Sequence, residues 1–157
     1  MTIHSPEGAA MTALILEIFR VNGLLLGAGD RLSRGLGLTS ARWQVLGALS
    51  EGPLTVAQVA RNMGLKRQSV QRLVDVLEEE GVVRFEDNPH HLRAKLIRMT
   101  DIGQRKYAKL MTIQAEWVNR LSRGLKPSYT PSRQTPKRPG QPGALPRWRA
   151  GCATKRA

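Results

Sequence analysis

Cysteine and aromatic residues are scarce in this chain of 157 residues, and acidic residues are few. The single cysteine, Cys152, cannot form an intramolecular disulfide, which is consistent with a reducing compartment. Aromatic residues make up only 4% of the chain, so the core must be aliphatic, which favours helices. With 12 Asp and Glu against 25 Lys and Arg, the net charge is +13. Such a charge attracts polyanions, of which nucleic acid is the commonest in a cell.

The positive charge is concentrated at the C-terminal end. Residues 126–157 contain eight Lys or Arg residues and no acidic residue, which leaves a net charge of +5 for residues 1–125. They also contain six of the nine prolines and show no apolar periodicity. Because such a segment cannot bury enough surface to offset its ordering entropy, we predict a disordered basic tail over 126–157.

The sequence contains no long uninterrupted hydrophobic run. The apolar stretch 11–27 includes Glu17, Arg20 and Asn22 and is interrupted by Gly23. It falls short of the roughly 20 apolar residues that a membrane span needs. The first ten residues lack the basic start of a signal peptide. We therefore expect a soluble, cytoplasmic protein with no membrane contact.

Residues of the kinds that carry catalysis or bind cofactors are also sparse. No glycine-rich phosphate loop is present, and the adjacent His90 and His91 have only the distant His4 as a third histidine. Cys152 falls in the predicted tail, and no paired carboxylates accompany an apolar pocket signal. We expect neither an enzyme nor a metal or cofactor site.

Apolar periodicity predicts a mainly α-helical fold. One long amphipathic helix is indicated over 11–26, where apolar residues recur at steps of three and four. A second helix begins at a cap formed by Thr39 or Ser40 and stops at Gly52. A third helix, 56–62, is capped by Thr55 and is followed by a turn at Gly64.

A fourth helix and a small β-hairpin follow. The helix is expected over 66–80, closed by Gly81, with an inward face of Val70, Leu73, Val74 and Leu77. Short runs with strand character, 82–85 and 94–99, flank a turn at Asn88-Pro89. Thr100-Asp101 then begins a last long helix that reaches about Leu125, with an apolar stripe along one side.

The order of helix, turn, helix and basic hairpin is that of a winged helix-turn-helix. With Val70 at the centre of the buried face, Gln68 and Arg72 point outward, as do Asp75 and Glu79, while Ser69 and Gln71 lie on the flanks. Gln and Arg pair bidentately with adenine and guanine, and Arg67 at the helix start can reach a phosphate or a base. A helix with one polar face is often simply solvated, so the order of elements carries this interpretation.

The residues from Leu38 to Tyr107 resemble the MarR family of multiple-antibiotic-resistance regulators. The resemblance rests on Leu38-Thr39-Ser40-Ala41-Arg42-Trp43-Gln44-Val45-Leu46, on Val70-Gln71-Arg72-Leu73-Val74-Asp75-Val76-Leu77-Glu78 and on Gly81-Val82-Val83-Arg84. A wing motif follows, from Asn88-Pro89-His90-His91-Leu92-Arg93 to Thr100 and then Gly103.

The resemblance implies a homodimer that represses or activates transcription by binding double-stranded DNA at a pseudo-palindromic operator. It implies N-terminal and C-terminal dimerisation helices, 9–37 and 101–125, around a DNA-binding domain, 38–100, and a possible small aromatic effector. The expected DNA-binding residues come from the recognition helix and the wing; they are Arg67, Gln68, Ser69, Gln71, Arg72, His91, Arg93 and Lys95.

The wing departs from the family pattern at one position. The family's wing arginine falls on Arg93, and the position two residues earlier, usually Asp, holds His91. A neutral imidazole can still accept a hydrogen bond, whereas a charged one would repel Arg93. We therefore expect a wing that is less rigid or slightly pH-sensitive; the alternative is that the two histidines lie exposed in a loop and only help to bind phosphate.

The C-terminal end departs further, because the family's final dimerisation helix is replaced by residues 126–157. We predict that a frameshift near codons 124–130 explains this replacement; the alternative is a genuine basic arm that adds nonspecific DNA affinity. The incomplete dimerisation half also leaves a second function open. The chain could be a winged-helix protein–protein module that heterodimerises with a full-length relative and modulates it.

Overall fold

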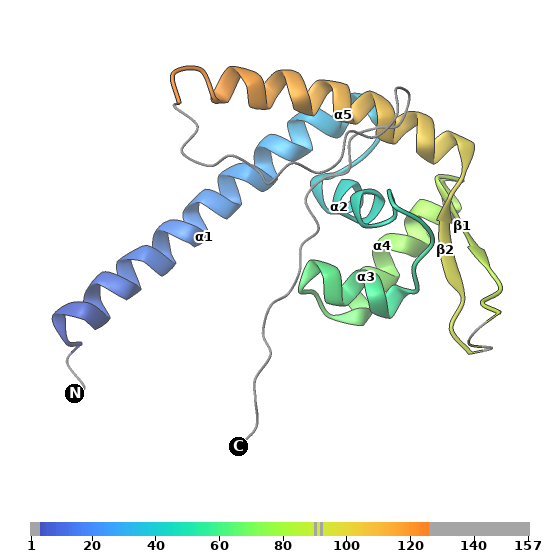
Figure 1. Ribbon diagram of the computed structural model, residues 1–157, viewed down its shortest axis with the longest axis horizontal. Helices are drawn as coiled ribbons and strands as arrows, with labels where there is room; N and C mark the ends of the chain where they lie inside the picture. Colours follow the sequence, from blue (N-terminus) through green and yellow to red (C-terminus); the bar gives the residue numbers. More distant parts are fainter. Residues whose placement is uncertain (1–3, 90, 92, 126–157) are drawn as a thin grey trace, which may run out of the picture.

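The computed structural model describes residues 4–89, 91 and 93–125 (Figure 1). The sequence predictions for 126–157, both the disordered tail and the frameshift, lie outside these residues. Among the described residues the fold is mainly α-helical with one small antiparallel hairpin, as the sequence predicted.

The first helix, α1 (Pro6–Ser33), continues into a short 3-10 turn, η1 (Arg34–Leu36). It begins several residues before the predicted apolar stripe because Ser5 caps it: the Ser5 hydroxyl accepts a hydrogen bond from the Gly8 N–H at 3.1 Å. Figure 1 shows α1 extending away from the rest of the described chain, and only its C-terminal part lies beside α2 and α5.

Three helices follow, and local capping signals set their bounds. They are α2 (Ser40–Ala48), α3 (Val56–Met63) and α4 (Arg67–Glu79). Thr39 caps α2, and Thr55 forms a reciprocal capping box with Gln58 at the start of α3. Gly64 ends α3 with φ +65, a left-handed conformation that glycine adopts without strain. The bounds of α3 and α4 lie within one residue of the predicted ones, whereas α2 begins as predicted but ends at Ala48, before the expected stop at Gly52.

The hairpin consists of β1 (Val83–Glu86) and β2 (Leu96–Met99), paired in the register Val83 to Met99. The second strand is shorter than predicted, because pairing ends at Glu86 and Leu96 and the residues before Leu96 belong to the loop. An isolated bridge joins Leu54, between α2 and α3, to Ile97 on the free edge of the hairpin. The hairpin is thereby attached to the helices beneath it.

The core lies between α2, α3, α4, the hairpin and the first half of α5 (Asp101–Leu121). Its largest fully buried side chains are aliphatic: Leu46, Leu77, Ile97 and Leu110. This agrees with the low aromatic content of the sequence.

The start of α5 is packed unusually closely against the hairpin. The Thr100 side chain caps the helix by accepting from the Gly103 N–H and donates to the carbonyl of Gly81 at 2.7 Å. A Cβ on Gly103 would collide with the Val82 carbonyl oxygen, so no larger residue fits there without movement. The Thr-x-x-Gly pattern is thus a packing requirement.

The far end of α5 differs from the sequence prediction. The helix ends at Leu121, and Leu125 lies beyond it with 72% of its surface exposed. Along the predicted stripe, Tyr107 and Leu110 are buried, whereas Val118 and Leu121 are exposed. The expectation of a helix to Leu125 was wrong by one turn, because these last residues find no partner among the described residues to stabilise the helix.

Most of α1 is exposed, with no cover from the part of the chain that the structure describes. Only Ala28, Gly29 and Ser33 are buried, although the helix carries ten exposed large apolar side chains: Met11, Leu14, Ile15, Leu16, Ile18, Phe19, Val21, Leu24, Leu25 and Leu26. The continuous segment Pro6–Leu36 is long and apolar enough by composition to cross a membrane. The segment therefore meets the length that the shorter stretch 11–27 does not reach.

Candidate nucleic-acid interface

The surface of α4 separates sharply into a buried and an exposed face. Val70, Val74 and Leu77 are fully buried, which fixes the rotation of the helix about its axis. Gln68 and Arg72, on the opposite side, are exposed, and Ser69 beside them is exposed as well. An exposed helix face of Gln, Ser and Arg offers donors that fit base edges in a major groove about 12 Å wide.

Gln71 lies differently from its predicted neighbours. It is half-buried, and its side-chain amide donates a hydrogen bond to the Asp75 carboxylate at 2.6 Å. Asp75, expected to point outward, is half-buried too. The pair stabilises α4 one turn apart, and Gln71 would have to give up this bond before it could reach a base.

The N-terminal end of α4 is open. Lys66 is the N-cap residue but forms no side-chain capping bond, and its side chain and that of Arg67 are exposed. Backbone N–H groups at such an end, together with the helix dipole, favour an anion such as a phosphate. Two exposed cations beside this end strengthen that preference.

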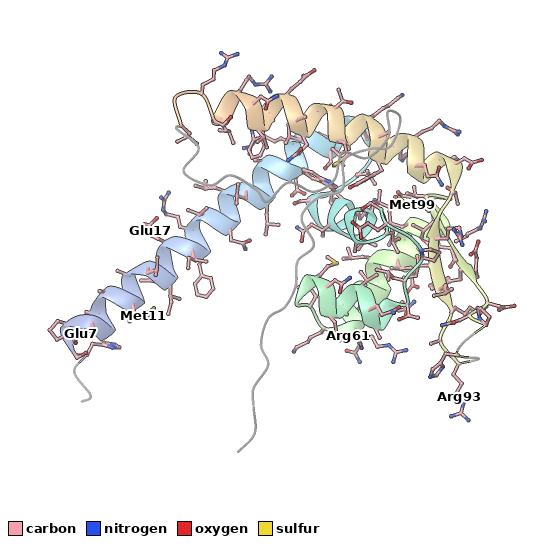
Figure 2. All side chains as sticks on the ribbon, in the orientation of Figure 1. Glu7, Met11, Glu17, Arg61, Arg93 and Met99 are labelled. Atoms are coloured by element: carbon pink, nitrogen blue, oxygen red, sulfur yellow. The ribbon has the colours of Figure 1, made fainter. Side chains whose placement is uncertain are left out.

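Two cations near α4 were missed by the sequence analysis. Lys66 immediately precedes the helix, and Arg61 is an exposed residue in the last turn of α3. Figure 2 shows Arg61 and the wing residue Arg93 along the same edge of the molecule, one below α3 and the other at the wing tip. The outward direction of Arg61 could have been read from the inward positions of Val59 and Ala60.

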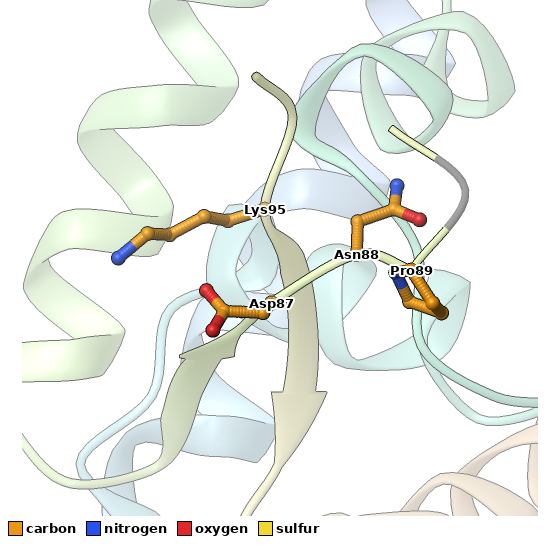
Figure 3. A pocket seen from close by; sticks show the side chains of 4 residues that line it. All are labelled: Asp87, Asn88, Pro89 and Lys95. Carbon is orange, nitrogen blue, oxygen red and sulfur yellow. The ribbon is translucent and has the colours of Figure 1, made fainter. Parts of the chain in front are cut away.

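The three predicted wing residues lie around the hairpin loop. His91, Arg93 and Lys95 are all exposed, and the loop is folded by the His91 N–H donating to the Asn88 carbonyl at 3.1 Å. No side-chain hydrogen bond or ion pair joins His91 to Arg93 among the described residues. Lys95 lines a shallow hollow of about 250 Å³ together with Asp87, Asn88 and Pro89. Figure 3 shows these four side chains.

Two further wing arginines are held by a carboxylate. Glu86 accepts from Arg84 through one oxygen at 2.7 Å and from Arg98 through the other at 2.7 Å. The hydrogen bond from Arg98, followed by that from Arg84, lowers the pKa of Glu86 below its usual value of 4.5. The carboxylate is therefore ionised at neutral pH and neutralises part of the positive charge of the wing.

The C-terminal end of α4 is acidic and contacts α2. Glu80, its C-cap, forms an ion pair with Arg42 of α2 at 2.7 Å. Glu78 and Glu79 are exposed at this same end, opposite the basic N-terminal end. The charge along α4 therefore runs from positive to negative, and only its first half suits a polyanion.

An exposed donor-bearing helix after a tight turn, with a basic hairpin beside it, defines a winged helix-turn-helix protein. The model of the MarR family matches residues 36–94, which contain α2, α3, α4 and β1. A protein of Mycobacterium tuberculosis is 34% identical over 115 residues, covering 73% of this chain and 80% of the relative. The chain belongs to the MarR family of DNA-binding transcription regulators.

Two named regulators are more distant relatives. The transcriptional repressor IacR of Pseudomonas putida is 25% identical over 107 residues, covering 68% of this chain and 64% of that protein. The transcriptional activatory protein BadR of Rhodopseudomonas palustris is 30% identical over 95 residues, covering 58% and 54%. Regulators with opposite effects on transcription are thus both similar to this chain.

Solved structures share the fold. A MarR-family regulator from Rhodococcus sp. RHA1 aligns with a TM-score of 0.67 at 29% identity, covering 74% of this chain and 83% of that one. CouR from Rhodococcus jostii RHA1, bound to p-coumaroyl-CoA, aligns with a TM-score of 0.64 at 29% identity, covering 72% and 80%.

Proposed function

We propose that this regulator reads its operator through the first half of α4 in the major groove, while the wing contacts the adjacent minor groove. The observation that carries the proposal is the exposed set Gln68, Ser69 and Arg72, which a fully buried opposite face of α4 holds in place. Arg67, Lys66 and Arg61 supply phosphate contacts that position the helix without reading sequence. Arg93 and Lys95 act from the wing, with His91 beside them.

The protein binds DNA as a homodimer in which α1 supplies most of the contact. Ten large apolar side chains of α1 are exposed in the single chain, and Val118 and Leu121 of α5 are exposed as well. An apolar surface of this extent on a soluble protein marks an interface. A second copy would cover it, and the two recognition helices would then face a pseudo-palindromic operator.

A membrane is the alternative cover for α1, because the segment Pro6–Leu36 meets the length and composition of a span. The family favours the dimer: its members are regulators that act on DNA, and the fold aligns with solved regulators over about three quarters of this chain. We therefore place the protein in the cytoplasm.

The regulator acts as a repressor that responds to a small aromatic effector. IacR is a repressor, and repression needs no contact beyond occupation of the promoter. BadR is an activatory protein and so has the opposite effect on transcription. The effector class is suggested by CouR, whose bound p-coumaroyl-CoA contains a phenolic ring. No observation on this chain favours the heterodimerising module as its function.

The test is binding of the purified full-length protein to the DNA beside its own gene. We expect retardation and a footprint over an inverted repeat, resistance to competition by scrambled DNA, and a dimer in sedimentation. A reporter fused to the same promoter should rise when the gene is deleted. Equal affinity for scrambled DNA would contradict sequence-specific recognition, and a monomer that still protects both half-sites would contradict the dimer.

A further inference from the structure

The junction between α1 and α2 is built from hydrogen bonds between side chains of α1 and backbone groups of the turn and of α2. The Asp30 carboxylate of α1 accepts a hydrogen bond at 2.6 Å from the backbone N–H of Ser40, the first residue of α2. A carboxylate at a helix N-terminus also interacts favourably with the helix dipole. Asp30 therefore holds the start of α2 against the end of α1.

Ser33 makes a second link across the same turn. Its side chain is fully buried, and its hydroxyl lies 2.8 Å from the Gly29 carbonyl and 2.9 Å from the Leu38 carbonyl. The Leu38 N–H donates back to the Ser33 carbonyl at 3.2 Å. The hydrogen bonds between Ser33 and Leu38 thus connect the two ends of the turn. Gly37 lies within this turn and has a left-handed conformation, with φ +69.

The two helices also approach each other closely at this point. A Cβ on Gly29 would lie 2.6 Å from the Ser40 hydroxyl oxygen, so only glycine allows this crossing without movement. Close contact and directional hydrogen bonds together leave little freedom in the angle at which α1 leaves α2. We call Asp30, Ser33, Leu38 and Ser40 the α1–α2 joint.

Arg42 extends the joint to the recognition helix. Its guanidinium pairs with Glu80 at the end of α4 and also lies 3.4 Å from the Gly37 carbonyl inside the turn. The Arg42 and Glu80 side chains are 23% and 36% exposed, so the pair is less screened than one on the open surface. A continuous set of polar contacts therefore runs from the end of α1 to the end of α4.

We propose that the α1–α2 joint sets the separation of the two recognition helices and thereby the half-site spacing that the regulator accepts. This inference rests on the proposed dimer: if α1 holds the two copies together, the angle at its end determines where each α4 lies. Asp30 and Ser33 are positioning residues, since neither lies on the surface proposed to contact DNA. One base pair of extra spacing moves a half-site by about 3.4 Å and turns it by roughly 35°, so a rigid joint must discriminate strongly.

The test compares operator duplexes that differ only by one base pair added or removed between the half-sites. We expect the wild-type dimer to bind the altered duplexes at least about tenfold more weakly, and Asp30→Ala or Ser33→Ala to reduce that ratio to about threefold or less. Affinity for the natural spacing should fall about fivefold, as after the loss of one intramolecular hydrogen bond. Asp30→Asn retains an acceptor for the Ser40 N–H and should restore most of the discrimination.

Thr12→Ala is the matched control, because the Thr12 hydroxyl makes the same bond to a carbonyl four residues earlier, at Gly8, but joins nothing else. It should keep the wild-type spacing ratio. Sedimentation and thermal unfolding of each variant show whether it remains a folded dimer. If folded joint variants keep the wild-type ratio, or Thr12→Ala loses it equally, the joint does not set the spacing. If the wild type itself is monomeric or shows no sequence preference, the proposed function fails instead.

Discussion

Arg72 is the exposed residue of α4 best suited to read a base, since Gln71 one position earlier is already bonded to Asp75. A long cation on the open face can reach a guanine edge without breaking an existing contact. Gln68 has the same freedom for adenine. Recognition of the operator bases should therefore depend mainly on Gln68 and Arg72. Gln71 should contribute less than its position on the helix alone suggests.

Replacing Arg72 with Ala should weaken operator binding by about 1–3 kcal/mol and relax the preference at one base position. The measurement is a set of titrations on operators that vary at each position in turn. Arg120→Ala, which removes an exposed arginine at the far end of α5, should leave the base preferences unchanged. If Arg72→Ala weakens binding to random DNA just as much, Arg72 contacts only phosphate.

Arg93 lies exposed beside the wing tip and forms no side-chain hydrogen bond or ion pair with the described residues. Arg93→Ala should therefore lower operator affinity while the thermal midpoint of unfolding stays nearly unchanged, because an exposed loop residue contributes little to the core. Arg93→Lys keeps the charge and separates the need for a cation from the need for a guanidinium. Unchanged affinity after Arg93→Ala would remove the wing from the mechanism.

At the scale of the elements, the Glu86 carboxylate of the wing forms ion pairs with two arginines of the same hairpin. Glu86→Gln should release Arg84 and Arg98 from their ion pairs, raise nonspecific DNA affinity and steepen the salt dependence by about 0.9 for each phosphate newly contacted. Glu116→Gln on α5 makes the same chemical change away from the wing. A salt slope equal to that of the wild type would show that these arginines do not reach DNA.

The lowered pKa of Glu86 also predicts over which pH range the effect of Glu86→Gln stays constant. Because the two arginines lower it below 4.5, the ion pairs persist above that value and are lost only as the pH falls through the lowered pKa. The difference between wild type and Glu86→Gln should therefore be the same at pH 6 and pH 8. A difference that disappears by pH 6 would mean that the carboxylate titrates far higher than the structure implies.

The contact between α5 and the hairpin predicts a strong effect on stability. Gly103→Ala would place a methyl group against the Val82 carbonyl oxygen, and the start of α5 would have to move. We expect a loss of about 2–4 kcal/mol in the free energy of unfolding, typical of severe overpacking. Gly47→Ala, in α2 with open space around it, is the control and should be neutral or slightly stabilising. Denaturant unfolding of both variants tests the difference.

The sequence predicted those features that local signals specify. The caps at Thr55 and Thr100 and the turn at Gly64 depend on residues within a few positions, and the structure confirms each of them. The cap expected at Thr39 or Ser40 is Thr39. Pairs between distant residues, such as Arg42 with Glu80, leave no local trace and were not predicted. The end of α5 was placed four residues too late because apolar spacing alone does not show whether a partner covers the stripe.

At the scale of the whole molecule, the described chain has a complete core around α2–α4 and an incomplete one along α1. The core elements cover one another, so the DNA-binding half needs no second copy to bury its apolar residues. The apolar side chains of α1 have no such cover. Folding of one half and assembly through the other should therefore be separable by mutation.

Phe19→Asp tests this separation. Phe19 is 67% exposed in the single chain, so a charge there should leave the core intact but cost the dimer the burial of an aromatic side chain and introduce a carboxylate into an apolar interface. We expect the sedimentation mass to fall towards that of one chain and operator affinity to fall with it, while circular dichroism stays helical. Ala13→Asp places the same charge on the side of α1 that already carries Glu17 and Arg20, and should remain dimeric. If Phe19→Asp stays dimeric and binds the operator as wild type does, the contact between the two copies lies elsewhere than on this face of α1.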